Sequence, residues 1–165
     1  MCNRKNSWRV SFKILLSSIV LASVLTACGS QPNYASVAIP KSYYSQQCFI
    51  TQDESFIWLE QEDEWLTLPA RAQQQFEQAD INWLQDNVLI VSAGQKPTAG
   101  FDVKLTSWLL EQHHWQVERQ LQVPKAGNLQ AMMISSPCVL VKIPKSVKSF
   151  ILNDPSGRAL GRWMY

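Results

Sequence analysis

Cysteines are the side chains of this sequence best suited to covalent chemistry. The chain of 165 residues contains four of them, Cys2, Cys28, Cys48 and Cys138. Cys28 follows an apolar run that ends in Leu25-Thr26-Ala27, and polar, turn-rich residues come directly after it. Basic residues precede the apolar run, which is too short to span a bilayer as a mature helix. This order predicts a cleaved export signal rather than a membrane-spanning anchor.

The motif Leu25-Thr26-Ala27-Cys28 resembles the lipobox of bacterial lipoprotein precursors. The resemblance implies cleavage before Cys28, a diacylglyceryl group on its sulfur and acylation of its new amino group. Two or three acyl chains, at about 0.8 kcal/mol per buried methylene, form a stable membrane anchor. In enteric-type bacteria an aspartate after the cysteine retains lipoproteins at the inner membrane, and Gly29 and Ser30 stand there instead. We therefore expect a lipid anchor in the outer membrane with the domain facing the periplasm. The alternative is an ordinary signal peptide, with Cys28 an incidental thiol.

Removal of residues 1–27 changes the charge of the protein. That segment holds four of the fifteen basic residues and none of the thirteen acidic ones, so eleven basic residues remain against thirteen acidic ones. The net charge changes from +2 to −2. Because the basic character of the precursor belongs to its targeting segment, net charge does not favour nucleic-acid binding, and we expect no nucleic-acid partner.

Cys48 and Cys138 are the two thiols that remain if Cys2 is discarded and Cys28 carries lipid. Two thiols in an oxidising envelope compartment predict a disulfide, which would contribute about 4–5 kcal/mol in the loop-entropy model. The alternative is a pair of separately buried thiols.

Hydrophobic periodicity predicts an α+β fold, mostly an antiparallel β-sheet or sandwich with one short helix, after the cleaved signal peptide. Residues 63–76 have apolar side chains at helical spacing after an acidic start, but Pro69 moves the expected start of regular helix to about Leu68. The continuous apolar run at 88–91 predicts a central strand. Period-two alternation predicts strands at 101–106 and 115–123. Further expected strands are 48–50, 56–59, 131–134, 139–143, 150–152 and 159–163, with a turn at 154–157.

The domain organisation expected from these patterns has three parts. Residues 1–27 are the signal peptide, 28–46 a tether, and 47–165 a single β-rich domain. The tether has little apolar periodicity, two prolines and many small polar residues, which suits a linker between lipid and domain. The remaining chain is long enough to bury a core as one domain.

A loop with unusual backbone requirements joins two strong strand candidates. It consists of Gly94, Gln95, Lys96, Pro97, Thr98, Ala99, Gly100 and Phe101. This pattern resembles the Gly-x-x-Pro-Thr-x-Gly-aromatic motif in the C-terminal domain of the protease complex subunit PrcB family. A later run from Ser136-Pro137-Cys138 to Pro144-Lys145 is similar to the same family's Ser-Pro-x, apolar residues and Pro-Lys. The resemblance extends over roughly residues 81–147. It implies a lipoprotein that associates with a surface protease and supports it without being a catalyst.

The same loop has other interpretations. It is faintly similar to the Asn-Pro-Thr-Thr-Gly-aromatic loop of chagasin-type cysteine-peptidase inhibitors, from which Lys96 and Ala99 depart. A phosphate-binding loop is excluded, because such loops lead into a helix, whereas this one leads into an expected strand. A purely structural role stays open, since Pro97 sets φ and the glycines permit positive φ. Residues 94–101 are the candidate partner-contact loop.

Few other residues have spacing that suggests chemistry. His113 and His114 are neighbours at an expected hairpin tip, and neighbouring strand residues point to opposite faces, so we expect no metal site. No nucleophile elbow or metalloprotease motif is present in the sequence. We therefore expect a non-enzymatic accessory or binding subunit without a cofactor, in contact with another envelope protein, with a protease complex as the candidate. The alternatives are a chagasin-like peptidase inhibitor and a small-ligand-binding periplasmic lipoprotein.

Overall fold

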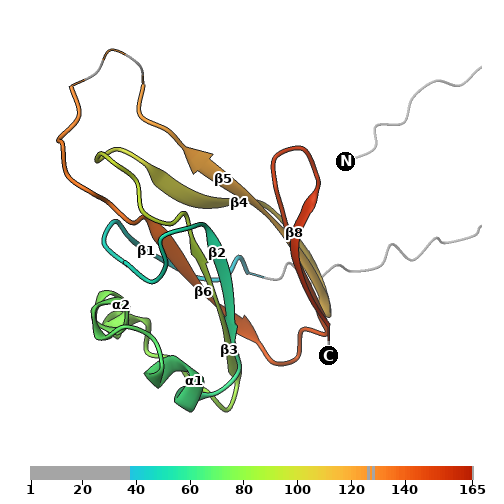
Figure 1. The fold of residues 1–165 in the computed structure, drawn as a ribbon. Coiled ribbons are helices and arrows are strands. Elements are labelled where there is room, and N and C mark those ends of the chain that lie inside the picture. Colours follow the sequence, from blue (N-terminus) through green and yellow to red (C-terminus); the bar gives the residue numbers. More distant parts are fainter. Residues whose placement is uncertain (1–37, 126, 128, 165) are drawn as a thin grey trace, which may run out of the picture. The chain divides into compact units, whose positions relative to one another are not determined.

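The computed structural model describes residues 38–125, 127 and 129–164. Within these residues the chain forms two four-stranded sheets and three short helical segments (Figure 1). The strands are β1 (Ser42–Ser45), β2 (Ser55–Leu59), β3 (Asp86–Ser92), β4 (Asp102–Glu111), β5 (His114–Gln122), β6 (Cys138–Pro144), β7 (Ser149–Asn153) and β8 (Ala159–Met164). The helical segments are α1 (Glu62–Leu66), α2 (Ala70–Gln75) and the 3₁₀ segment η1 (Glu77–Ala79). The expected signal peptide and Cys28 lie outside the described residues.

The first sheet has the order β1-β6-β3-β2, and each neighbouring pair is antiparallel. Leu89 and Val91 of β3 face a core between the two sheets. Val88 and Ile90 face a second core on the other side of the same sheet. Both faces of β3 are therefore buried, which explains the continuous apolar run at 88–91 and confirms the prediction of a central strand.

The second sheet has the order β4-β5-β7-β8, with β5 and β7 parallel and the other pairs antiparallel. Val103 and Leu105 of β4 face the core between the sheets, as period-two alternation predicts. A register shift between Thr106 and Leu109 then interrupts the strand, with Ser107 at φ 52°. A bulge changes which side chains face inward, so Trp108 and Leu110 pack on the core after it. The prediction of a mostly antiparallel α+β sandwich is confirmed.

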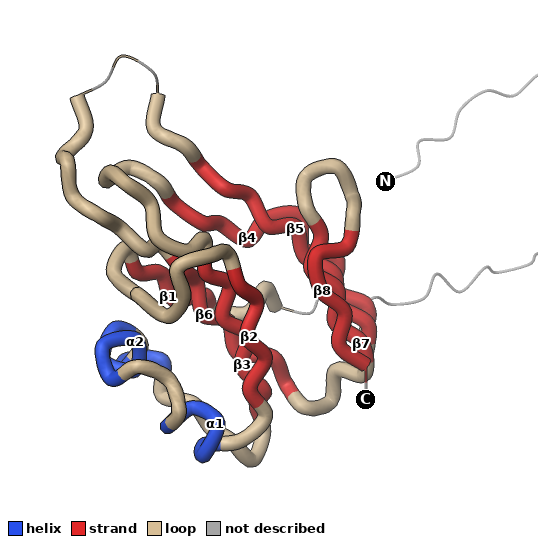
Figure 2. Tube along the Cα trace, in the orientation of Figure 1, coloured by secondary structure: helices blue, strands red, loops and turns tan. Residues whose placement is uncertain are grey.

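The short helices lie on the outer face of the first sheet, opposite the second sheet (Figure 2). The single helix expected at 63–76 is wrong, because α1 and α2 are separated by residues 67–69. Pro69 has no N–H to donate to a preceding turn, and inside a helix its ring would clash with the carbonyl four residues back. The helix therefore ends before Pro69, and a new helix begins at Ala70. Among the described residues, no helix is long and apolar enough to cross a membrane.

Three other expectations need correction. The expected tether reached residue 46, but β1 (Ser42–Ser45) pairs with β6, so the ordered domain begins earlier. The strand expected at 48–50 is absent from the structure, because Phe49 has a left-handed φ of 49°. The strand expected at 131–134 is also absent; this segment instead bonds to a loop. The remaining expected strands and the turn at 154–157 are confirmed.

Candidate partner-contact site

The candidate loop at 94–101 connects β3 of the first sheet to β4 of the second. Gly94 and Gly100 have φ values of 72° and 90°, in the left-handed region that the sequence suggested for them. A Cβ on Gly94 would lie 2.5 Å from the Gln52 carbonyl oxygen and 2.5 Å from the Asp53 carbonyl carbon. Only glycine therefore allows this close approach of two backbone segments.

The long connection between β5 and β6 holds the candidate loop by backbone hydrogen bonds. The Lys96 N–H donates to the Ser135 carbonyl at 2.8 Å, and the Ser135 N–H donates back at 3.0 Å. The Ala99 N–H donates to the Ala131 carbonyl at 3.2 Å, and the Ser135 hydroxyl donates to the Thr98 carbonyl at 2.8 Å. These bonds order the loop against a segment that lies more than thirty residues away in the sequence.

The predicted disulfide is present and lies beside these loops. It joins Cys48 to Cys138, with their Cα atoms 6.2 Å apart. The Cys48 N–H donates to the Ser136 carbonyl at 3.0 Å, and the Ser136 N–H donates to the Gln46 carbonyl at 2.9 Å. The disulfide and these bonds fix segments 46–53, 94–101 and 129–138 to one another. We call this part of the domain the loop end.

A cavity of about 430 Å³ opens at the loop end. Its walls include Ala99, Gly100 and Phe101 of the candidate loop, together with Met133 and Ser135 of the β5–β6 connection. Gln46 bridges toward β4, because its amide Nε2 donates to an Asp102 carboxylate oxygen at 3.2 Å. The structure therefore brings together the last three residues of the predicted loop at one concave surface.

The β5–β6 connection, which contributes Met133 to this cavity, carries several exposed apolar side chains, where the sequence had predicted a strand at 131–134. Met132 is 89% exposed and Leu129 is fully exposed. We call the exposed apolar residues of the β5–β6 connection the apolar rim, and they are Val123, Leu129, Met132, Met133 and Ile134. The signal in the sequence is the apolar run 131–134 before a serine-proline pair, a pattern that a buried strand also shows. Apolar patches of this kind mark interaction surfaces, and methionine adapts to irregular partners.

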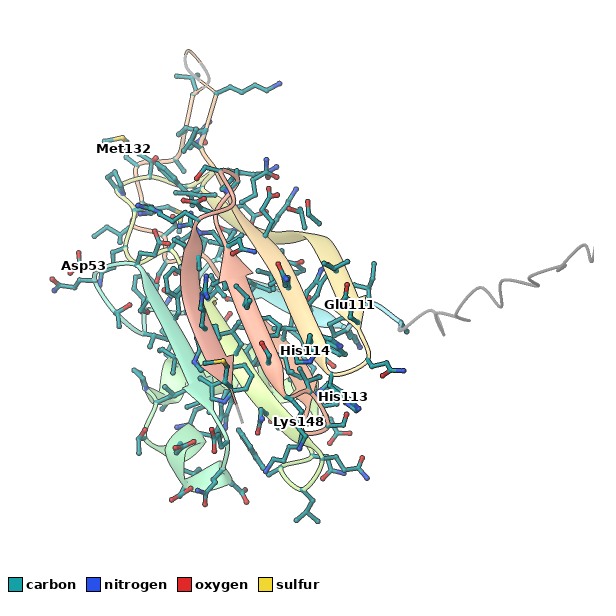
Figure 3. All side chains as sticks on the ribbon, turned by 90° about the vertical axis from the view of Figure 1, so that its right-hand side faces the viewer. Asp53, Glu111, His113, His114, Met132 and Lys148 are labelled. Atoms are coloured by element: carbon teal, nitrogen blue, oxygen red, sulfur yellow. A yellow bond between two sulfur atoms is a disulfide. The ribbon has the colours of Figure 1, made fainter. Side chains whose placement is uncertain are left out.

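The two histidines lie far from Met132, toward the other end of the domain (Figure 3). His113 is in the β4–β5 turn, as predicted, and its ring Nδ1 lies 2.8 Å from the Ser146 carbonyl oxygen. His114 begins β5 beside it. In the described part of the chain, no group of three or more His, Cys, Asp or Glu residues is placed to hold a metal ion.

Asp154 has a lowered pKa in the turn between β7 and β8. The Ser156 hydroxyl donates to its carboxylate at 2.6 Å, and this is the largest cause of the lowered pKa. Backbone N–H groups of Arg158 and Ser156 donate to the same oxygen at 3.0 and 2.9 Å. These contacts stabilise a turn.

Residues 87–144 match the family model described as PrcB C-terminal. This segment is PrcB-like. It runs from β3 to the end of β6, so it contains the whole candidate loop and the apolar rim, whereas α1, α2 and β7–β8 lie outside it. No curated protein matches the chain, and no solved structure does. The resemblance inferred from the two loop motifs is thus confirmed over the PrcB-like segment.

Proposed function

We propose that this chain is a non-enzymatic accessory lipoprotein, anchored in the outer membrane through lipid on Cys28, whose loop end binds another envelope protein. The observation that carries the proposal is the apolar rim, which leaves five apolar side chains of the β5–β6 connection exposed, one of them, Met133, in the wall of the cavity. Burying such a side chain against a partner contributes about 1.5–3 kcal/mol. Residues 94–101 contribute both a wall of the cavity and the backbone bonds that hold the rim.

The order of the loop end supports binding with little loss of conformational entropy. The disulfide and the Lys96–Ser135 bridge hold the surface in place before a partner arrives. Preorganised surfaces bind more tightly, because fewer groups must be ordered on association. The PrcB-like segment supports a protease complex as the partner, which is the finer form of the proposal.

Site-specific photo-cross-linking in intact cells tests the proposal. A photoreactive phenylalanine analogue replaces Met132 in one strain and Met164 in a matched strain, because Met164 is 79% exposed but lies on β8. We expect a discrete cross-linked protein from position 132 that is absent from position 164. Mass spectrometry of that product decides whether the partner belongs to a protease complex. Equal products from both positions would exclude a specific contact at the loop end.

A matched pair of double variants measures the energy of the contact. Leu129→Gln with Met132→Gln removes two apolar rim side chains, whereas Leu84→Gln with Met164→Gln changes two similarly exposed apolar side chains elsewhere. We expect the rim variant to weaken the purified complex at least tenfold and the control variant to leave its affinity unchanged. A folded rim variant that binds with normal affinity would contradict the proposal.

The lipid anchor is tested separately. Metabolic labelling with a palmitate analogue should modify the wild-type chain, and Cys28→Ser should abolish both the label and membrane fractionation. A labelled Cys28→Ser chain would show that the anchor lies elsewhere.

A further inference from the structure

A second cavity, of about 510 Å³, lies at the helical layer and outside the PrcB-like segment. Residues of α1, α2 and η1 line it, together with the turn that precedes β3. Phe76, which is 1% exposed, lies in its wall. The cavity is therefore independent of the loop end and of the function proposed for it.

Two tryptophans form aromatic walls of this cavity. Trp65 of α1 and Trp83 of the turn before β3 have ring centroids 6.3 Å apart, with their planes at 50°. Both side chains are only partly buried. Both side chains line the cavity, so part of their ring surface is accessible from it. The face of an indole ring attracts a cation through its quadrupole more strongly than other aromatic rings do.

The charged side chains that line the cavity are all carboxylates, namely Glu62, Glu77 and Asp80. Lys142 approaches from β6, and its Nζ donates to the backbone carbonyl of Asp80 at 3.1 Å. Lys142 itself does not line the cavity. The lining therefore carries an excess of negative charge next to two aromatic faces.

Local hydrogen bonds hold the walls of the cavity in place. The Glu64 carboxylate accepts the N–H of the N-cap residue Gln61 at 3.3 Å, which caps the start of α1, and it also accepts the N–H of Glu60 at 2.6 Å. The Gln73 side-chain amide donates to the Leu68 carbonyl at 2.8 Å and ties α2 to the segment after α1. The two short helices are thereby fixed to each other, although neither would be stable alone.

We propose that this cavity binds an organic cation, an ammonium or guanidinium group, against its two tryptophan rings and beside its three carboxylates. Such a cation is less strongly hydrated than a divalent metal ion, so it can contact ring faces while its charge stays near the carboxylates. The same chemistry is found in a lysine or arginine side chain of another protein and in a free polyamine.

Nuclear magnetic resonance of the full chain in detergent, with its tryptophan indoles labelled with nitrogen-15, tests the proposal. The probes are Nα-acetyl-arginine amide, Nα-acetyl-lysine amide, putrescine and magnesium chloride at low salt. We expect saturable shifts of the Trp65 and Trp83 indole signals with the organic cations and weaker shifts with magnesium. Stronger binding of the amino-acid amides points to a protein side chain, and stronger binding of putrescine points to a free amine. Equal shifts with magnesium, or no saturable shift, would overturn the proposal.

Two variants that remove the same charge distinguish binding at the cavity from a general attraction of cations to the negatively charged protein. Asp80→Asn removes a lining carboxylate at a left-handed position that asparagine tolerates. Asp63→Asn removes an exposed carboxylate of α1 that does not line the cavity. We expect the affinity for the best organic probe to fall about two- to fivefold with Asp80→Asn and to stay unchanged with Asp63→Asn. Equal losses in the two variants would overturn the proposal.

The aromatic contribution is tested by Trp83→Leu, which keeps an apolar side chain. We expect the affinity to fall about fivefold or more, because an open aromatic face is lost. The indole spectrum of the other tryptophans reports whether this variant is folded, and Glu77→Gln provides a second test at an exposed side chain. Full affinity in a folded Trp83→Leu variant would exclude the aromatic walls from binding.

Discussion

Replacement of Gly94 by alanine tests the close approach that holds the loop end together. The new Cβ would lie 2.5 Å from the carbonyl oxygen of Gln52, so segment 52–53 must move away. That movement breaks the bond from the Gln95 N–H to the Gln52 carbonyl, which is 2.8 Å long. Gly157→Ala is a matched control, because Gly157 also has a positive φ, of 83°, but a Cβ added there would meet no atom within 4 Å.

The expected magnitudes follow from these contacts. A left-handed conformation costs a non-glycine residue about 1–2 kcal/mol, and the stiffer unfolded chain offsets about 0.4–1 kcal/mol of this. Gly157→Ala should therefore lower the free energy of unfolding by about 1 kcal/mol. Gly94→Ala adds a lost hydrogen bond of about 1 kcal/mol and the strain of displaced backbone, for a total of about 2–4 kcal/mol.

Urea denaturation of the full chain in non-reducing detergent buffer, followed by tryptophan fluorescence, measures both variants. With a slope of about 1–3 kcal/mol per molar urea, a difference of about 2 kcal/mol shifts the midpoint by about 1 M. If the free energies of unfolding of the two variants fall by the same amount within about 0.5 kcal/mol, then segment 52–53 moves at no cost in free energy. The close approach would then not hold the loop end together.

Three further predictions concern other contacts. The Cys48→Ser, Cys138→Ser double variant should lower the free energy of unfolding by about 4–5 kcal/mol, because the bridge closes a loop with a sequence separation of 90; urea denaturation measures the loss. Glu54→Gln should lower stability by about 1 kcal/mol, because it leaves the partly buried Arg119 without its carboxylate partner, and Arg119→Met should largely restore it in a double-variant cycle. The turn at Asp154 should loosen in acid, because the pKa of Asp154 is lower in the folded protein than in the unfolded chain. The stabilisation by the Asp154 carboxylate is therefore present above the unfolded pKa and is lost as the pH falls through the folded pKa. Amide shifts of the neighbouring residues across an acid titration report this loss.

Each of these predictions has a result that would contradict it. Unchanged stability of the double cysteine variant would show that the bridge does not constrain the unfolded chain. Additive effects of Glu54→Gln and Arg119→Met would show that the two side chains do not interact across the sheets. An unchanged acid titration in Asp154→Asn would assign the amide shifts to another group.

Much of the fold follows from local patterns in the sequence. Alternation with period two identified β4 and β5, and the continuous apolar run at 88–91 identified a strand buried on both faces. Elimination of the targeting cysteines left Cys48 and Cys138, which the structure pairs. The strand predictions succeeded because side-chain periodicity depends on neighbouring residues and not on the final fold.

Other features of the fold could not be predicted from local sequence patterns. The β5–β7 pairing is parallel, and β1 joins the first sheet through β6, although residues 42–45 resemble a linker in composition. The bulge at Ser107 also reverses which side chains of β4 face inward. Such pairings depend on the order of strands in the sheets, which the sequence of a single strand does not contain.

The sequence by itself predicted an export signal with a candidate lipid site, and it determined two thiols suited to pairing, the strand pattern and a loop that requires glycine and proline. The tertiary structure alone decided what surrounds that loop. The apolar run at 131–134 is compatible with a buried strand as well as with an exposed rim, and in the structure it lies beside residues 96–99 with Met132, Met133 and Ile134 exposed. The tryptophan and carboxylate cavity likewise depends on how α1, α2 and the turn before β3 meet. Burial depends on contacts between distant segments, so a run of apolar residues does not by itself predict whether its side chains are buried or exposed.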